Sequence, residues 1–416
     1  MQIKRLVSTL LVALPVIVGC RADETLNAPA VVNPLFRRYV SMGNSITSGF
    51  QSAGIDDSTQ QRSYAVLIAK AMGTSFNYPK LNGRGCPPPF TNNVTQTRVG
   101  GGTSTTCDLR VPISGLINNV AVPGAQAQDL LSNFGVDSAA NALTTFFLGG
   151  STQIKRMAEA QPTFVSAWIG NNDVLGSLLS LTNPGDPALI TPSAMFNAEV
   201  DSIATAIKAT GAKAALIGAA DVAVIPYSSK GTLYFCLSAA AAGACGLPTV
   251  LPPTFHVSPT CAPGAVGGLG DTTLVPWPIG VPLILAAAQG ATDTLDCTRD
   301  NQVVTASELA GLHAATAAFN AHIQAVASAN GWAYLDPNPP LLAAHADTSK
   351  VEPFPQIPPN PLTAPVRFGS WFTLDGIHPS ALVHRLVADS LASVINATYG
   401  TSLPIPVCGS VTCPAP

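Results

Sequence analysis

Residues 163–173 read Thr-Phe-Val-Ser-Ala-Trp-Ile-Gly-Asn-Asn-Asp, and this stretch favours one fold class. The apolar run 163–169 is bounded by Pro162 and Gly170, which is typical of a buried strand. Groups that follow a buried parallel strand collect at the carboxyl edge of its sheet, so Asn172 is a candidate functional residue. The alternative is that the Asn-Asn-Asp run only caps a helix.

Runs of the same kind alternate with helical patterns along the rest of the chain. The expected strands are 36–42, 119–122, 163–169, 214–218 and 332–335. The expected helices are 64–72, 192–210, 305–330 and about 380–397. Strands that alternate with helices indicate an α/β fold with a largely parallel sheet. The Pro-rich stretch 337–365 is predicted to be a long loop.

Two other segments differ from this pattern. Residues 225–300 are rich in Pro and Gly and carry four cysteines, so we interpret them as a cap inserted into a domain that spans 36–400. Residues 401–416 form a cysteine-bearing tail.

The amino terminus has the pattern of an export signal. Lys4 and Arg5 precede an apolar run, residues 6–19, that is too short to span a bilayer comfortably. The run ends at Cys20 in a sequence similar to the bacterial lipobox. We therefore expect a lipoprotein signal peptide at 1–19, a lipidated Cys20, a tether at 20–35 and a mature protein anchored in the cell envelope. The alternative is an ordinary signal peptide with an incidental cysteine.

Composition excludes two classes of protein. The chain has 416 residues, of which 47% are hydrophobic and 10% are charged, and its formal net charge is −3. A dedicated nucleic-acid binder needs a large excess of positive charge, which is absent. A disordered chain has the opposite balance of charge and hydrophobicity.

The cysteine count fits an exported protein. Removing Cys20 from the nine cysteines leaves eight, an even number that predicts four disulfides. Pairing of sequence neighbours gives 86–107, 236–245, 261–297 and 408–413. A metal cluster is a weaker alternative, because the chain has no Cys-x-x-Cys pair and no His at zinc-site spacing from a Cys. We expect no metal and no organic cofactor.

Four groups of candidate residues follow the predicted strands. Ser45 follows the first strand, Gly124 the second and Asn172 the third, while Asp375 and His378 share a loop before the last helix. Each group alone is also explained by an ordinary turn, cap or surface loop. Their common position at strand ends and their order along the chain make the set specific.

This set resembles the blocks of the SGNH (GDSL-type) serine hydrolases, in the stretches 165–173 and 375–379 above all. The resemblance covers 36–222 and 300–398. It implies a three-layer α/β/α sandwich, flavodoxin-like, with about five parallel strands. It also implies Ser45 as nucleophile, His378 as general base and Asp375 as its orienting carboxylate. The implied oxyanion hole consists of the Ser45 and Gly124 N–H groups and the Asn172 amide.

One residue departs from the family signature Gly-Asp-Ser, because Asn44 replaces the Asp. The resemblance still implies hydrolysis of a carboxylic ester, and the apolar cap and the tether favour lipid or acyl-chain esters. One alternative is an acyltransferase that uses the same site. The other is a non-catalytic envelope lipoprotein that binds lipid or polymer on a hydrolase scaffold.

Overall fold

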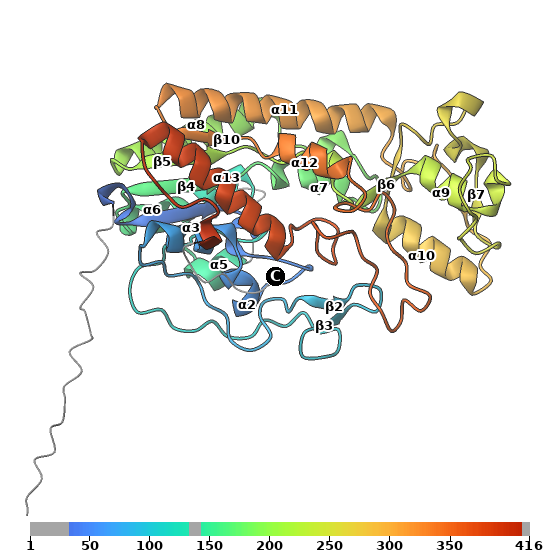
Figure 1. Ribbon diagram of the computed structural model, residues 1–416, viewed down its shortest axis with the longest axis horizontal. Coiled ribbons are helices and arrows are strands. Elements are labelled where there is room, and N and C mark those ends of the chain that lie inside the picture. Colours follow the sequence, from blue (N-terminus) through green and yellow to red (C-terminus); the bar gives the residue numbers. More distant parts are fainter. Residues whose placement is uncertain (1–32, 133–142, 410–416) are drawn as a thin grey trace, which may run out of the picture.

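The computed structural model describes residues 33–132 and 143–409. Its central sheet has four parallel strands, in the spatial order β1 (Tyr39–Gly43), β4 (Phe164–Trp168), β5 (Lys213–Ile217) and β10 (Ala333–Leu335). Tyr39, Phe164 and Lys213 lie in register at the start of their strands. The predicted α/β fold with a parallel sheet is confirmed, and the strand carboxyl ends point toward one end of the molecule (Figure 1).

The expected strand 119–122 is only partly formed, so the prediction of about five strands is corrected to four. This segment runs beside β1, where the Val120 N–H donates to the Ser41 carbonyl over 2.9 Å and the Val122 N–H to the Gly43 carbonyl over 3.2 Å. Only one parallel bridge, between Ser41 and Asn119, results. Pro123 has no N–H, so the ladder cannot continue past the segment.

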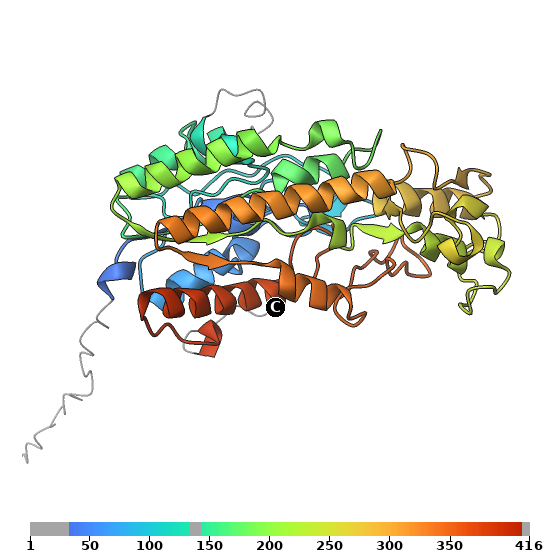
Figure 2. The same cartoon turned by 90° about the horizontal axis from the view of Figure 1, so that it is seen from above.

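Side chains of the sheet alternate between two apolar layers. Val40 and Met42 belong to one buried cluster, whereas Tyr39 and Phe164 belong to another. The first cluster is covered by α4 (Ala127–Leu131), α6 (Gln153–Glu159), α8 (Ser193–Ala209) and α11 (Ala306–Ala329). The second is covered by α3 (Tyr64–Met72) and α13 (Ala381–Tyr399). Figure 2 shows the sheet between these two helical layers.

The helix signals in the sequence explain where the long helices begin. Thr305 and Glu308 form a capping box at the start of α11, with the Glu308 carboxylate accepting the Thr305 N–H over 2.8 Å. The prediction of a loop at 337–365 is wrong at its start, because α12 (Asn338–His345) forms there. Pro339 lies in its first turn, where a missing N–H does not break the helix.

Residues 225–300 build small elements around an apolar cluster of their own, at the right of Figure 1. The elements are β6 (Ser228–Lys230), α9 (Gly231–Leu237), β7 (His256–Val257), β8 (Leu274–Pro276), α10 (Trp277–Ala288) and β9 (Thr294–Leu295). Tyr234 and Phe255 lie in its centre.

Disulfides join Cys86 to Cys107, Cys236 to Cys245 and Cys261 to Cys297, as predicted. The fourth predicted pair includes Cys413, which lies outside the described residues.

The remaining elements lie around the carboxyl edge of the sheet or cover its flanks. They are α1 (Ser45–Ser48), α2 (Asp57–Gln61), β2 (Phe90–Asn92), β3 (Thr97–Arg98), α5 (Leu143–Leu148) and α7 (Asn172–Leu178). Within residues 33–132 and 143–409, no helix combines the length and the apolar character that crossing a bilayer requires.

Candidate active site

The turn from β1 into α1 places Ser45 at the carboxyl edge of the sheet. Gly43 has a φ of +148°, and a Cβ at this position would lie 2.5 Å from the Trp168 carbonyl oxygen, so only glycine fits. The Asn44 side-chain oxygen then caps α1 by accepting the Ile46 N–H over 3.2 Å. Ser45 is thereby the first residue of α1, where a helix leaves the backbone N–H without an internal partner.

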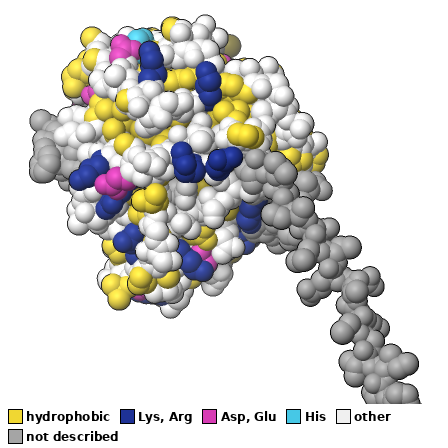
Figure 3. All heavy atoms as spheres, turned by 90° about the vertical axis from the view of Figure 1, so that its left-hand side faces the viewer, with side chains coloured by type: hydrophobic (Ala, Val, Ile, Leu, Met, Phe, Trp, Pro, Cys, Tyr) yellow, Lys and Arg dark blue, Asp and Glu magenta, His cyan; other side chains and the backbone are white. Residues whose placement is uncertain are grey.

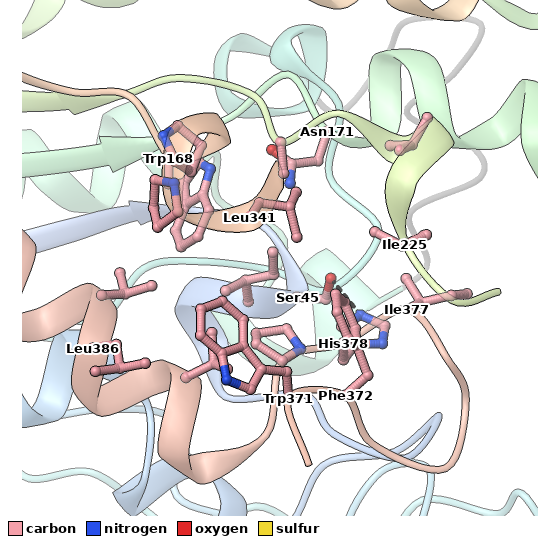
Figure 4. A pocket seen from close by; sticks show the side chains of 18 of the residues that line it. Ser45, Trp168, Asn171, Ile225, Leu341, Trp371, Phe372, Ile377, His378 and Leu386 are labelled. Atoms are coloured by element: carbon pink, nitrogen blue, oxygen red, sulfur yellow. Dashed lines mark hydrogen bonds between the residues drawn. The ribbon is translucent and has the colours of Figure 1, made fainter. Parts of the chain in front are cut away.

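Three predicted residues form one hydrogen-bonded chain. The Ser45 Oγ lies 2.9 Å from His378 Nε2, and His378 Nδ1 lies 2.8 Å from Asp375 Oδ2. Ser45, His378 and Asp375 are 8%, 9% and 5% exposed, so this chain is shielded from water but still accessible at Ser45. The Phe50 ring packs on the imidazole with 4.9 Å between ring centroids. Figure 4 shows Ser45 and His378 side by side at one end of a pocket.

The Asp375 carboxylate accepts five hydrogen bonds. Oδ1 accepts the N–H groups of Ile377 and His378, both over 2.9 Å, and the Thr373 hydroxyl over 3.1 Å. Oδ2 accepts the Ala53 N–H over 2.6 Å in addition to the imidazole. Burial alone would raise the pKa of Asp375, but the charge of His378 and these donors lower it to about 2. The carboxylate is therefore ionised at neutral pH and oriented from several sides.

A segment that begins at Cys86 holds the Ala53 turn. We call residues 86–98 the strap; the Cys86–Cys107 disulfide fixes its first residue. Its Phe90 N–H donates to the Ser52 carbonyl over 2.7 Å, and its Arg98 Nη1 donates to the Ala53 carbonyl over 2.9 Å. Arg98 is 8% exposed and lies over the Phe90 ring. The strap thus fixes the turn that supplies a donor to Asp375.

The residues on the other side of Ser45 offer further donors. Asn172 begins α7, and its side-chain amide donates to the Ala125 carbonyl over 2.9 Å with one of its two N–H bonds. Gly124 precedes Ala125 and has a φ of +81°, and a Cβ built on it would meet no atom within 4 Å. An open space beside a left-handed glycine is a position where a substrate can approach the backbone closely.

The Asp173 side chain, in the first turn of α7, joins this helix to neighbouring segments. Its carboxylate accepts the Thr191 hydroxyl over 3.0 Å and the Ala127 N–H over 3.1 Å. Burial raises the pKa of Asp173 to about 7 against the effect of these hydrogen bonds, and the charges of Glu199 and Asp129 raise it further. Asp173 therefore joins α4 to α7 next to Asn172.

A groove with a cavity volume of about 300 Å³ leads away from Ser45 and His378. Its walls are mainly apolar side chains from α12, α13 and the loop before α13, including Leu341, Trp371, Phe372, Val383, Leu386 and Val387. Figure 4 shows Leu341 and Leu386 lying away from Ser45 along this groove. The groove does not run under residues 225–300, except for Ile225 at its edge.

The structure therefore brings Ser45, Asp375 and His378 together and places Asn172 on the same groove. Gly124 does not line the groove but adjoins Asn172 through Ala125. Cys20 lies outside the described residues. Within the described ranges, no group of three or more His, Cys, Asp or Glu side chains is arranged to hold a metal ion.

Several supporting residues escaped the sequence reasoning. Ala53, Thr373 and Arg98 carry no chemical signature. Ala53 and Arg98 act across sequence separations of 322 and 45 residues, whereas Thr373 lies two residues from Asp375. Trp277, in the insertion, donates its Nε1–H to the Asp375 carbonyl over 3.2 Å. Its position in a Pro-Trp-Pro stretch of the insertion was the only signal.

The protein-family model described as GDSL-like lipase/acylhydrolase matches residues 39–391 of this chain. The chain belongs to this family. Family membership makes it an ester hydrolase of the lipase and esterase type. Among curated proteins, none matches this chain.

Solved structures similar to this chain include an extracellular lipase from Streptomyces rimosus, with 15% identity and a TM-score of 0.37, covering 86% of this chain and 98% of that one. A catalytic variant of an acetylxylan esterase from Geobacillus stearothermophilus has 10% identity and a TM-score of 0.35. The match covers 88% of this chain and 94% of that one. A hydrolase from the metagenome of Lake Arreo, Spain, has 11% identity and a TM-score of 0.37. The match covers 87% of this chain and 94% of that one.

His384, buried behind the site, gives a prediction about acid stability. Its Nδ1 accepts the Tyr64 N–H over 3.2 Å, and burial, aided by the charge of His378, lowers its pKa to about 3. The unfolded chain protonates this group at an ordinary pKa of about 6.5. The stability contributed by the neutral imidazole is therefore complete above pH 6.5 and is lost as the pH falls toward 3.

We expect the free energy of unfolding of the parent to fall by about 2–3 kcal/mol more than that of His384→Asn between pH 6.5 and 4.5. Denaturant titrations at several pH values measure this difference. Asp173 titrates in the same window with the opposite sign, but it is present in both proteins. Equal pH dependence of the two proteins would contradict the assignment.

Proposed function

We propose that this protein hydrolyses carboxylic esters of apolar acyl chains through an acyl-enzyme on Ser45. The observation that carries the proposal is the hydrogen-bonded chain from Ser45 Oγ through His378 to the Asp375 carboxylate. A serine hydroxyl is a weak nucleophile until a neighbouring base accepts its proton, and this geometry provides that base.

In the first half of the reaction, His378 Nε2 accepts the Ser45 proton as Oγ attacks the ester carbonyl carbon. Asp375 holds the ring so that Nδ1 keeps its proton, and it stabilises the imidazolium that forms. The tetrahedral intermediate then collapses, and His378 returns the proton to the departing alkoxide. In the second half, water takes the place of the alcohol and releases the acid from Ser45 by the same steps.

The developing oxyanion needs donors that are already in place. We assign this role to the N–H groups of Ser45 and Gly124 and to the second N–H of the Asn172 amide. Each such donor contributes roughly 3–4 kcal/mol of transition-state stabilisation in comparable sites. The bond from Asn172 to Ala125 supports the assignment, because it fixes the amide beside the open face of Gly124.

The replacement of the family Asp by Asn44 is compatible with this chemistry. The Asn44 side-chain oxygen makes the same hydrogen bond to the α1 backbone that a carboxylate would make. Its contribution is to the turn at Ser45 and not to the proton transfer.

The groove supports the preference for acyl chains. Its apolar walls begin at Ser45 and continue between α12 and α13. An acyl chain bound to Ser45 would therefore be removed from water along its whole length. Burial of each methylene contributes about 0.8 kcal/mol to binding. The support for lipid-like esters therefore comes from this groove more than from the insertion at 225–300.

We propose further that the protein is exported and anchored through Cys20. The three disulfides support an oxidising compartment, since such bonds are rare in reducing cytosol.

The first prediction concerns the nucleophile. A fluorophosphonate probe is expected to add once to the parent and not to Ser45→Ala, and Ser45→Ala should lose p-nitrophenyl ester turnover. Asn172→Ala should still react with the probe but lose at least a hundredfold in kcat, because only an oxyanion donor is removed. Intact-mass spectrometry and ester kinetics measure both results. Labelling of Ser45→Ala at the parent rate would contradict the proposal.

The second prediction concerns the groove. Leu341→Trp adds bulk to the groove wall, so kcat/KM for p-nitrophenyl decanoate should fall at least tenfold while that for the acetate stays within twofold. Leu342→Trp, on the exposed side of the same helix, is the matched control and should change neither value. Equal losses on both esters would show that the acyl chain binds elsewhere.

The third prediction concerns the strap. Arg98→Met removes the donor to the Ala53 carbonyl, so the Ala53 N–H should hold Asp375 less well and kcat should fall about tenfold, with KM within twofold. Arg98→Lys should restore part of the loss. Arg84→Met, in the same region but paired with Asp108, is the control. A change in KM alone would assign Arg98 a purely structural role.

A further inference from the structure

Basic side chains gather at the end of the molecule where the strands begin. Arg37 and Arg38 directly precede β1, and Lys213 is the first residue of β5. Lys70 and Lys208 lie in the last turns of α3 and α8, which end at the same edge. These five residues define what we call the basic end: Arg37, Arg38, Lys70, Lys208 and Lys213.

Hydrogen bonds show that these segments lie side by side. The Arg38 N–H donates to the Thr163 hydroxyl over 3.0 Å, which joins the start of β1 to the start of β4. The Thr74 hydroxyl donates to the Arg37 carbonyl over 3.1 Å, which joins the end of α3 to the same place. Figure 3 faces this end and shows Lys and Arg side chains spread among apolar ones, with few Asp or Glu.

The positive charge at this end is not neutralised locally. The five basic residues make no salt bridge with any residue in the described ranges. Glu159 is the only acidic residue in the segments 37–38, 70–76, 155–163 and 208–213. The basic end therefore differs in sign from the chain as a whole, whose formal net charge is −3.

We propose that the basic end docks on an anionic lipid bilayer. The chain outside the described structure supports a membrane as the partner, since the described residues begin at Asn33, next to Arg37, and the preceding residues lead to Cys20. Residues 20–32 span at most about 45 Å when extended, so a protein anchored at Cys20 stays close to the surface. A lipid chain together with a basic patch is a combination that gives stable membrane binding.

Docking in this way sets the direction of the groove. Ser45 follows the carboxyl end of β1, so it lies at the end of the sheet opposite to the basic end. The groove would then open away from the leaflet that carries the anchor.

The test uses the chain from residue 21 onward, which lacks Cys20 but keeps every described element. It is sedimented with vesicles of phosphatidylcholine alone or with 30% phosphatidylglycerol. We expect binding only to the anionic vesicles, and release as NaCl rises from 50 to 500 mM, because salt screens charge. Absence of binding to anionic vesicles at 50 mM would overturn the proposal.

The quadruple variant Arg37→Gln, Lys70→Gln, Lys208→Gln and Lys213→Gln should weaken vesicle binding at least tenfold, since each basic residue near an anionic leaflet strengthens binding by roughly fivefold. The control changes Lys80, Lys230, Arg299 and Arg367 to Gln, which alters net charge equally, and should stay within threefold of the parent. Equal weakening in both variants would overturn the proposal. So would binding to heparin without binding to vesicles, which would indicate a soluble polyanion as the partner. Unchanged p-nitrophenyl acetate turnover in both variants shows that they are folded.

Discussion

The hydrogen bonds to the Asp375 carboxylate are the constraint on which the arrangement of this site depends. A buried carboxylate is destabilised by several kcal/mol unless donors replace the water that it loses. Five donors meet this requirement here, and they come from the loop before α13 and from the turn at Ala53. Because those segments are 322 residues apart in sequence, the carboxylate is satisfied only when the tertiary fold brings them together.

The turn at Ala53 shows what this requirement demands of the surrounding chain. Ser52 and Ala53 have φ values of 53° and 52°, in the left-handed region that non-glycine residues adopt at a cost of roughly 1–3 kcal/mol. The strap offsets that cost with hydrogen bonds from Phe90 and Arg98 to the two carbonyls of the turn. The Cys86–Cys107 bond limits the freedom of the strap in the unfolded chain. The Cys86–Cys107 disulfide thereby contributes, through the strap and the Ala53 turn, to the position of the carboxylate that orients His378.

The sequence predicted the parts of the molecule that are encoded locally. The apolar run 163–169 and the Thr305–Glu308 capping box predicted the strand and helix that the structure shows. Hydrophobic patterning and helix capping both act within a few residues along the chain. Ser45, Gly124 and Asn172 were found by their position after strands, and Asp375 and His378 by their shared loop before the last helix. The donors from Ala53 and Arg98 could not be found in this way, since an alanine N–H and a buried arginine have roles only through contacts made by the tertiary fold. The helix α12 was missed because Pro339 resembles a loop residue unless its place in the first turn is known.

The polarity of a parallel sheet connects the groove to the basic end. In such a sheet every strand carboxyl end lies on one edge, so residues that directly follow strands, such as Ser45 and Asn172, meet there. The helices that precede the strands end at the opposite edge, and cations are favoured at helix carboxyl termini, as Lys70 and Lys208 illustrate. One topological rule therefore places the proposed chemistry and the positive charge at opposite ends. A membrane held by that charge leaves the groove accessible, whereas a membrane at the other edge would cover it.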